Sequence, residues 1–157
     1  ALGLADRGWE AAVTVFSAVA LQRAAHLWDQ RVQPLGRLHV RQADVVADPL
    51  GDQGFDLVVV CYLQIPAEDR GRAHRSAAAA VAPGGTLLVV AHHTDNLTEG
   101  VGGPQDLAVL FTEVDVVADL EGTGLTVESA VKAARAVEVA GSTTHAYDAV
   151  VLARRPA

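Results

Sequence analysis

Residues 55–63, Phe-Asp-Leu-Val-Val-Val-Cys-Tyr-Leu, form an almost unbroken apolar run, and residues 82–90, Ala-Pro-Gly-Gly-Thr-Leu-Leu-Val-Val, form a second. A strand that is buried on both faces loses the alternation of a half-exposed strand and becomes continuously apolar. The segment between the two runs, residues 66–81, is typical of a helix. Two parallel strands joined by a helix make a right-handed βαβ unit. This stretch therefore predicts an α/β fold built around residues 55–90.

The flanking segments add further elements to this unit. We predict strands at residues 11–16, 38–43, 125–135 and 146–154, and helices that end near residue 7 or cover residues 18–30 and 111–121. Ser17 and Thr112 are the expected caps of the last two helices, and Pro83-Gly84-Gly85 is expected to form a turn that ends the helix at residues 66–81. The last two strands are expected to form a hairpin through residues 141–144. The pattern indicates an α/β fold of about six strands and three or four helices, with a mostly parallel sheet that ends in an antiparallel hairpin.

Composition narrows the class of protein. The chain has 157 residues, half of them hydrophobic and 20% charged, so we expect one folded domain over residues 1–157. No apolar run reaches the roughly 18 residues that span a bilayer. The net charge of −7 argues against a nucleic-acid binder, because neutralising phosphates needs clustered Lys and Arg. The single cysteine, Cys61, fits the cytoplasm. We predict a cytoplasmic protein without nucleic-acid or membrane partners.

Four segments occur in an order and at a spacing that match a known family. They are Ala5-Asp6-Arg7-Gly8-Trp9 with Phe16-Ser17-Ala18-Val19-Ala20-Leu21, then Gln42-Ala43-Asp44-Val45, Phe55-Asp56-Leu57-Val58 and Ala82-Pro83-Gly84-Gly85-Thr86-Leu87. In this order the chain resembles the class I S-adenosylmethionine-dependent methyltransferases, specifically the small bacterial kind related to the tellurite-resistance methyltransferases. The resemblance implies a three-layer Rossmann-like sheet, S-adenosylmethionine as cofactor, and methyl transfer to a small-molecule acceptor.

The resemblance also implies a set of cofactor-binding residues. They are Phe16, Ser17, Asp44, Val45, Cys61 and Tyr62. Asp44 would accept a hydrogen bond from the adenine amino group, Val45 would pack on the ring, and Phe16 would cover the nucleoside. Four of the six have a structural alternative: Asp44 as a loop-capping residue, Phe16 and Tyr62 as core aromatics, and Cys61 as a small buried residue.

Substrate-binding candidates follow the second apolar run. In a parallel sheet, ligands bind outside the carboxyl ends of the strands, where His92, His93 and Asn96 stand. Adjacent strand residues point to opposite faces, so His92 and His93 are poorly placed to share a metal, and we predict no metal site. One of the two histidines facing the crevice would contact the substrate or act as general base. The alternative is a polar start to a loop, and the pattern identifies no catalytic residue.

Two positions differ from the family pattern. The family's glycine-rich loop, which follows its first strand, would lie before Ala1, and Val15 stands where the family has the acid that binds the ribose. In the family the first strand lies between the second and the fourth. We therefore expect an upstream segment, direct pairing of the strands at residues 11–16 and 55–63, or a strand from a partner chain, as in a homodimer.

Two other functions remain open at this point. Val15 and the lack of the glycine-rich loop also fit a non-catalytic or degenerate Rossmann-like domain. A nicotinamide-dinucleotide oxidoreductase would use a similar crevice, but it needs a Gly-x-Gly-x-x-Gly motif and a strand-end acid, and neither is visible in these residues.

Overall fold

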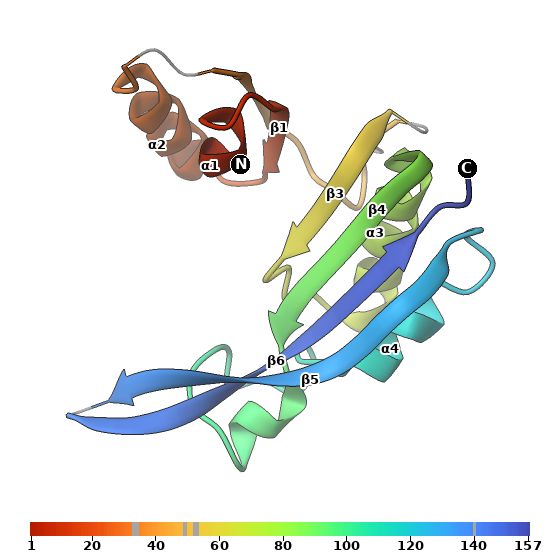
Figure 1. Cartoon of the computed structure of the whole chain (residues 1–157). Coiled ribbons are helices and arrows are strands. Elements are labelled where there is room, and N and C mark those ends of the chain that lie inside the picture. The colour runs from red at the N-terminus through yellow and green to blue at the C-terminus, as the bar shows by residue number, and fades with distance from the viewer. Residues whose placement is uncertain (33–34, 49, 52–53, 140) are drawn as a thin grey trace. The chain divides into compact units, whose positions relative to one another are not determined.

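The computed structural model describes residues 1–32, 35–48, 50–51, 54–139 and 141–157. The chain divides into two compact units, Ala1–Asp48 (unit 1) and Pro49–Ala157 (unit 2). Each unit is described by itself, and the single domain expected over residues 1–157 stays a prediction. Figure 1 shows the elements of both units.

Unit 1 is a small parallel α/β arrangement. Its elements are α1 (Leu2–Ala5), β1 (Glu10–Val15), α2 (Ala18–Asp29) and β2 (Arg37–Gln42). β1 pairs in parallel with β2, with Val15 opposite Gln42 at the last position. Ser17 caps α2, as the sequence predicts, because its Oγ accepts a hydrogen bond from the backbone N–H of Ala20 at 3.3 Å. Because both strands are parallel, their carboxyl ends lie at the same edge of this sheet.

Unit 2 contains the expected βαβ unit and the expected hairpin. Its elements are β3 (Phe55–Cys61), α3 (Ala67–Ala80), β4 (Val81–His92), the 3₁₀ helix η1 (Thr94–Leu97), α4 (Glu113–Asp119), β5 (Thr126–Val139) and β6 (Ser142–Arg154). Its four strands lie in the order β3-β4-β6-β5. Only β3 and β4 are parallel; β6 is antiparallel to both β4 and β5. The expectation of a mostly parallel sheet is therefore wrong for this unit, because the long hairpin supplies half of its strands.

The Pro-Gly-Gly sequence lies inside β4 rather than in a turn before it. Phe55 is opposite Val81, but Leu57 is opposite Thr86, so β4 has extra residues where the register shifts. Gly84 takes a positive φ of 75° there, a conformation that glycine adopts without steric cost. Pro83 cannot donate a ladder hydrogen bond and is tolerated at such an irregularity. The Pro-Gly-Gly residues, which the sequence predicts to form a turn, therefore form a bulge within β4.

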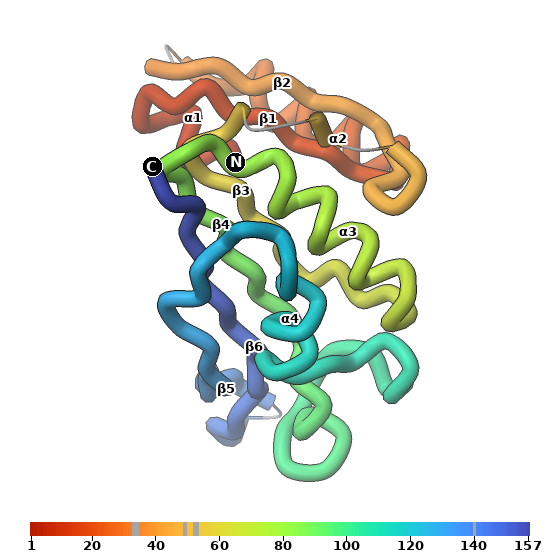
Figure 2. The backbone as a smooth tube through the Cα atoms, turned by 90° about the vertical axis from the view of Figure 1, so that its right-hand side faces the viewer, coloured from red at the N-terminus to blue at the C-terminus, as the bar shows by residue number. Residues whose placement is uncertain are grey.

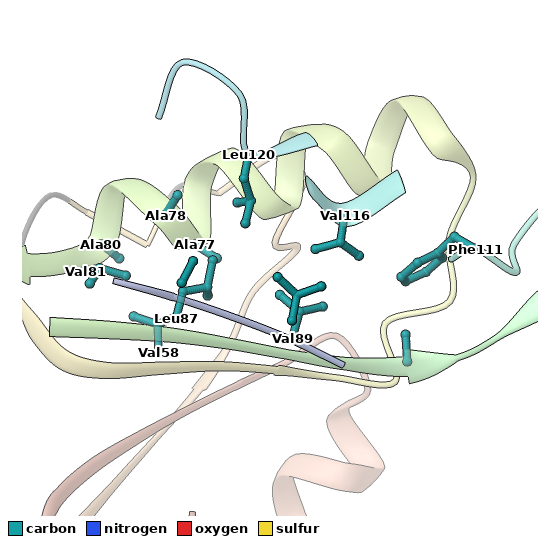
Figure 3. Packing of buried hydrophobic residues seen from close by; sticks show 13 residues of the cluster. Val58, Ala77, Ala78, Ala80, Val81, Leu87, Val89, Phe111, Val116 and Leu120 are labelled. Atoms are coloured by element: carbon teal, nitrogen blue, oxygen red, sulfur yellow. The ribbon is translucent and has the colours of Figure 1, made fainter. Parts of the chain in front are cut away.

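The helices α3 and α4 lie side by side over one face of the sheet of unit 2 (Figure 2). Between the helices and the sheet lies a cluster of buried apolar side chains (Figure 3). Leu87 and Val89 of β4 are fully buried in it, at alternate positions. Ala77, Ala78 and Ala80 of α3 are also buried, and their small side chains let the helix approach the strands closely.

A local cap completes the start of α4, and a distant arginine completes the end of α3. Thr112 caps α4, as predicted, and forms a capping box with Asp115. The carboxyl end of α3 has no basic residue of its own in its last turn. Arg155 acts there instead: its Nε donates to the carbonyl oxygen of Val81 and its Nη2 to that of Ala78, both at 2.8 Å. The positive guanidinium therefore meets the negative end of the helix dipole.

The strands β1 and β3 belong to different sheets. Direct pairing of these two strands, one of the three expected outcomes, is therefore not what the structure shows. In the part of the chain that is described, β3 pairs with β4 alone and β1 with β2 alone. β3 is also not buried on both faces: Val58 is buried against the helices, whereas Val59 is 43% exposed. An upstream strand and a strand from a partner stay predictions.

Candidate active site

The carboxyl ends of β1 and β2 bring together the four cofactor candidates of unit 1. The backbone N–H of Ala43 donates to the carbonyl oxygen of Val15 at 3.2 Å. The Gln42 side chain donates to the carbonyl oxygen of Phe16 at 3.1 Å. These bonds hold the segment after β1, with Phe16 and Ser17, beside the segment after β2, with Asp44 and Val45. The strand-end rule applied to the sequence is consistent with this placement.

Asp44 is anchored by its own loop. One carboxylate oxygen, Oδ1, accepts from the backbone N–H of Val46 at 2.9 Å, and the N–H of Asp44 donates to Asp48 at 3.0 Å. No described residue donates to the second oxygen, Oδ2, which leaves it able to accept a hydrogen bond. Phe16 is 77% exposed, so the core-aromatic alternative does not describe it. An acceptor and an exposed aromatic ring fit the base of a nucleoside, but Val15 offers no acceptor to a ribose hydroxyl.

The second group of candidates lies in unit 2, where β3 and β4 end. Tyr62 follows β3 directly and has a positive φ of 52°, a conformation that non-glycine residues seldom adopt. Its backbone N–H donates to the carbonyl oxygen of Val90 at 2.7 Å, which holds this conformation against β4. Strained backbone of this kind concentrates at functional sites. The Tyr62 side chain is 43% exposed, and its ring lies 4.6 Å from the ring of His92.

A buried carboxylate organises the side chains around Tyr62. Asp148 of β6 is 4% exposed, and it accepts from the Tyr62 hydroxyl at 3.3 Å and from Nε of Arg135 at 2.9 Å. Nδ1 of His92 lies 3.8 Å from its other oxygen. The bond to Asp148 raises the pKa of Arg135, and desolvation together with Asp148 raises the pKa of Tyr62. Both groups therefore keep their protons near neutral pH and act as donors to Asp148.

His92 is held through its backbone and packed at its ring. Its backbone N–H donates to the side-chain oxygen of Gln64 at 3.1 Å, and Gln64 in turn donates to the carbonyl of Val109 at 2.7 Å. Gly103 lies against the ring, because a Cβ at that position would come within 2.7 Å of the His92 Cγ. Nδ1 is buried without a hydrogen-bond partner among the described atoms, whereas the side chain as a whole is 21% exposed.

His93 and Asn96, the other substrate candidates, are buried and bonded to the protein. Nδ1 of His93 accepts from the backbone N–H of Asp95 at 3.1 Å, and its Nε2 lies 3.3 Å from Glu113. The Asn96 amide donates to the carbonyl of Tyr147 and accepts from the N–H of Tyr147, both at 2.7 Å. These bonds fasten η1 to β6. They give Asn96 an evident structural task, while substrate contact by either residue stays a prediction.

The alternative that Cys61 is a small buried residue is wrong, because Cys61 is exposed. The alternation of β3 explains this: Val58 faces the helices, and odd-numbered positions such as Val59 face the other way. Partial desolvation raises the pKa of the Cys61 thiol, so its thiolate form is scarce at neutral pH. In the described ranges, no three His, Cys, Asp or Glu side chains gather as a metal ion would require.

The sequence did not indicate Arg135 or Asp148 as members of this group. Arg135 and Asp148 come from β5 and β6, and their meeting depends on the register of the hairpin, in which Arg135 is opposite Ala146. Asp148 is the one carboxylate in an otherwise apolar strand segment, Ala146 to Ala153. A buried carboxylate needs hydrogen-bond partners, so this pattern was a signal for a site at Asp148.

No helix among the described residues combines the length and the apolar character needed to cross a membrane. The sequence matches no protein-family model and no curated protein.

Solved structures, by contrast, share the fold over nearly the whole chain. A SAM-dependent methyltransferase from Methanosarcina mazei matches with a TM-score of 0.74 and 15% identity, over 99% of this chain and 86% of that one. Magnesium protoporphyrin IX methyltransferase from Synechocystis PCC 6803, solved with bound SAH, gives a TM-score of 0.71 and 14% identity, over 98% and 68%. A [4+2]-cyclase gives a TM-score of 0.68 and 15% identity, over 94% and 66%. At these identities the likeness concerns the fold: the chain has the Rossmann-like fold of the class I S-adenosylmethionine-dependent methyltransferases.

Proposed function

We propose that this protein transfers a methyl group from S-adenosylmethionine to a small-molecule acceptor. The observation that carries the proposal is the match of nearly the whole chain to solved methyltransferases, one of them with bound SAH. The strand ends of both units add support, because they carry the polar and aromatic side chains that the strand-end rule expects at a ligand site. The relation to the tellurite-resistance methyltransferases, the cytoplasmic location and a homodimer belong to the same proposal.

The cofactor would be held mainly by the strand ends of unit 1. In this proposal Asp44 accepts a hydrogen bond from the adenine amino group through Oδ2, and Val45 and Phe16 pack on the nucleoside. Ser17 lies beside them, with its hydroxyl in the cap of α2. When bound, S-adenosylmethionine supplies an electrophilic methyl group on a positively charged sulfur. Val15 offers no hydrogen-bond acceptor to the ribose, so we expect weaker binding than an acid at this position would give.

The acceptor side would be formed by the strand ends of unit 2. The backbone of Cys61 and Tyr62 would line the methionine part of the cofactor, and His92 with His93 would border the acceptor. Methyl transfer needs mainly positioning of donor and acceptor, together with a base where the acceptor must lose a proton. A set of rigidly held side chains with one accessible imidazole satisfies both requirements.

Isothermal titration with S-adenosylmethionine and with its demethylated product tests the cofactor assignment. We expect heat from both ligands and none from NAD. Asp44→Ala should weaken binding about 10-fold, since a lost hydrogen bond costs about 1–2 kcal/mol. Asp29→Ala, which alters an exposed aspartate at the end of α2, should bind as the unaltered protein does. Heat from neither ligand would overturn the assignment.

The degenerate Rossmann-like domain and the nicotinamide-dependent oxidoreductase gain no support from the structures compared above. The [4+2]-cyclase does show that this fold is also present in a protein whose named activity is not methyl transfer. Binding of S-adenosylmethionine without methylation of any acceptor would therefore favour a non-methylating role. Incubation with methyl-labelled cofactor and a metabolite extract, read by mass spectrometry, separates the two outcomes.

A further inference from the structure

We propose that His92 takes the proton from the methyl acceptor and that Asp148 positions it for this task, so that the acceptor is a hydroxyl compound of weak acidity. This inference rests on the proposed methyltransferase function, and it names the acceptor class and the residue that activates it. It is carried by the contacts of the buried Asp148 and by the difference in environment between two adjacent histidines.

The structure separates the two histidines clearly. Both ring nitrogens of His93 face protein groups, the N–H of Asp95 and the carboxylate of Glu113, and the side chain is only 6% exposed. His92 is 21% exposed, and its buried nitrogen is Nδ1. Nε2 is not among the buried unpartnered atoms and has no hydrogen bond to a described residue, so it is the nitrogen that an acceptor can reach.

Asp148 determines which nitrogen of His92 carries hydrogen. Its Oδ1 lies 3.8 Å from Nδ1, and no other acceptor among the described groups approaches this nitrogen as a hydrogen-bond partner. A small rotation of the ring brings an Nδ1–H into hydrogen-bond distance of the carboxylate. Hydrogen bonds of catalytic groups are often long without ligand and tighten in the complex. With hydrogen on Nδ1, the lone pair of Nε2 points outward as a proton acceptor.

Arg135 and Tyr62 keep the carboxylate in place. Arg135 donates to Oδ2 at 2.9 Å, and the Tyr62 hydroxyl donates to the same oxygen at 3.3 Å. Nη2 of Arg135 also donates to Oδ1, at 3.5 Å. A carboxylate oxygen can accept a second hydrogen bond, so Oδ1 stays available to His92. The Tyr62 ring, tilted at 35° to the imidazole, limits how far the imidazole can turn. Asp148, Tyr62 and Arg135 are therefore positioning residues, and His92 is the residue that touches the acceptor.

The reaction balances with these groups. As the acceptor oxygen forms a bond to the donor methyl carbon, Nε2 of His92 takes the hydroxyl proton, and the electrons of the carbon–sulfur bond remain on sulfur. The imidazolium that forms is stabilised by Asp148 and later releases its proton to water. An imidazole base suits a phenol-like hydroxyl with a pKa of about 10, whereas a thiol ionises near pH 8.5 unaided and a tertiary amine has no proton to lose.

Nitrogen-15 NMR of the histidine rings, at a pH where they are neutral, tests the positioning without any cofactor. We expect hydrogen on Nδ1 of His92 in the unaltered protein and a shift of most of the population to the Nε2–H form in Asp148→Asn. His145, which is exposed on β6, is the internal control and should not change. Hydrogen on Nε2 in the unaltered protein, or no change in the folded variant, would overturn the proposal.

Diethyl pyrocarbonate gives a second measurement on the unaltered protein, in case the variant does not fold. It acylates accessible unprotonated imidazoles, so His92 should react before His93. A faster reaction at His93 would contradict the assignment.

Turnover tests the acceptor class. With S-adenosylmethionine and panels of phenols, thiols and tertiary amines, we expect methylation of phenols, lowered about 100-fold or more in His92→Ala. Methylation of a tertiary amine would overturn the hydroxyl class. If no acceptor is methylated but the NMR result is as expected, the proposed function is at fault and the positioning of His92 stands.

Discussion

His74 Nδ1 lies 2.9 Å from Asp119 Oδ2, and this contact joins α3 to α4 inside unit 2. His74 is fully buried, and its Nε2 has no hydrogen-bond partner among the described groups. Nε of Arg70 donates to the same aspartate oxygen at 2.7 Å. Phe111 closes the group, with its ring edge-on to His74 and beneath the Arg70 guanidinium. The two helices are thus joined by a buried polar group as well as by apolar packing.

Because His74 is buried beside Asp119, we expect the free energy of unfolding to decrease in mild acid. Burial lowers the pKa of His74, although Asp119 acts in the opposite direction. Between the unfolded pKa of about 6.5 and the lower folded value, the unfolded chain binds a proton that the folded chain does not. Protons therefore favour unfolding in this window, and the stability present above pH 6.5 falls as the pH decreases. Urea unfolding at a series of pH values should show the loss.

His74→Gln provides the matched comparison, because glutamine cannot titrate. The variant should be less stable at pH 8 but lose less stability on acidification than the unaltered protein. His26→Gln, at an exposed position of α2, should keep the original pH dependence. An unchanged pH dependence in His74→Gln would contradict the assignment.

Asp119→Ala should destabilise the protein by about 3–5 kcal/mol. Arg70 is only 10% exposed, and the substitution would leave its charge buried without a carboxylate. Arg72→Ala, which removes exposed ion pairs with Glu68 and Asp69, should cost less than about 1 kcal/mol. Chemical unfolding measures both, and equal costs would show that burial does not decide the strength of the α3–α4 link.

Asn96→Ala should loosen the connection between η1 and β6. The substitution removes both bonds to the Tyr147 backbone and leaves a partly buried N–H unpaired, at a cost of about 1–3 kcal/mol. The Tyr147 amide should then exchange hydrogen faster, as mass spectrometry or NMR can record. Thr98→Ala, at an exposed position just after η1, should leave this exchange rate unchanged.

Two neighbouring glycines offer a matched pair beside the candidate base. Gly102 and Gly103 both have positive φ, of 85° and 78°, so alanine at either position costs about 1–2 kcal/mol. A Cβ at Gly102 meets no atom, whereas at Gly103 it would meet the His92 ring. Gly103→Ala should therefore shift the ring signals of His92 and lower turnover, and Gly102→Ala should lower only the melting temperature. Equal ring shifts in both variants would contradict the packing of Gly103 on His92.

The free side of β3 leads to a prediction about its backbone. Unpaired strand edges are costly to bury and are normally covered or paired. We expect all amides of Leu57–Val60 to be protected from hydrogen exchange in solution, including those that do not donate to β4. Light scattering tests the expected homodimer at the same time. A monomer in which alternate amides of β3 exchange freely would contradict the expectation.

The sequence was most informative where a local signal and a nearby contact coincide. Three local features of the sequence are confirmed by the structure: the apolar run after Phe55, the helix caps Ser17 and Thr112, and the βαβ order. The exposure of Cys61 could not be predicted in this way, since continuous apolarity does not say whether a second layer covers the strand. The sequence therefore predicts where strands and helices lie along the chain better than it predicts which strand faces are buried by other elements.

The candidate site could be predicted in part for the same reason. Tyr62 and His92 follow strands directly, so the strand-end rule identifies them. Asp148 and Arg135 reach the same place only through the register of a long hairpin, and pairing register depends on the turn that joins the two strands. The sequence alone therefore could not show that the charged side chains of Asp148 and Arg135 lie near His92.

Arg155 also has a consequence for synthesis on the ribosome. Its guanidinium binds carbonyl oxygens that lie 74 and 77 residues earlier, at Val81 and Ala78. Chains emerge from the amino end at about 5–20 residues per second. The last turn of α3 is therefore synthesised several seconds before its cationic partner, and β4 is completed before β6, whose paired residues lie 56 to 68 positions later. The nascent chain must carry an incomplete helix end through this interval.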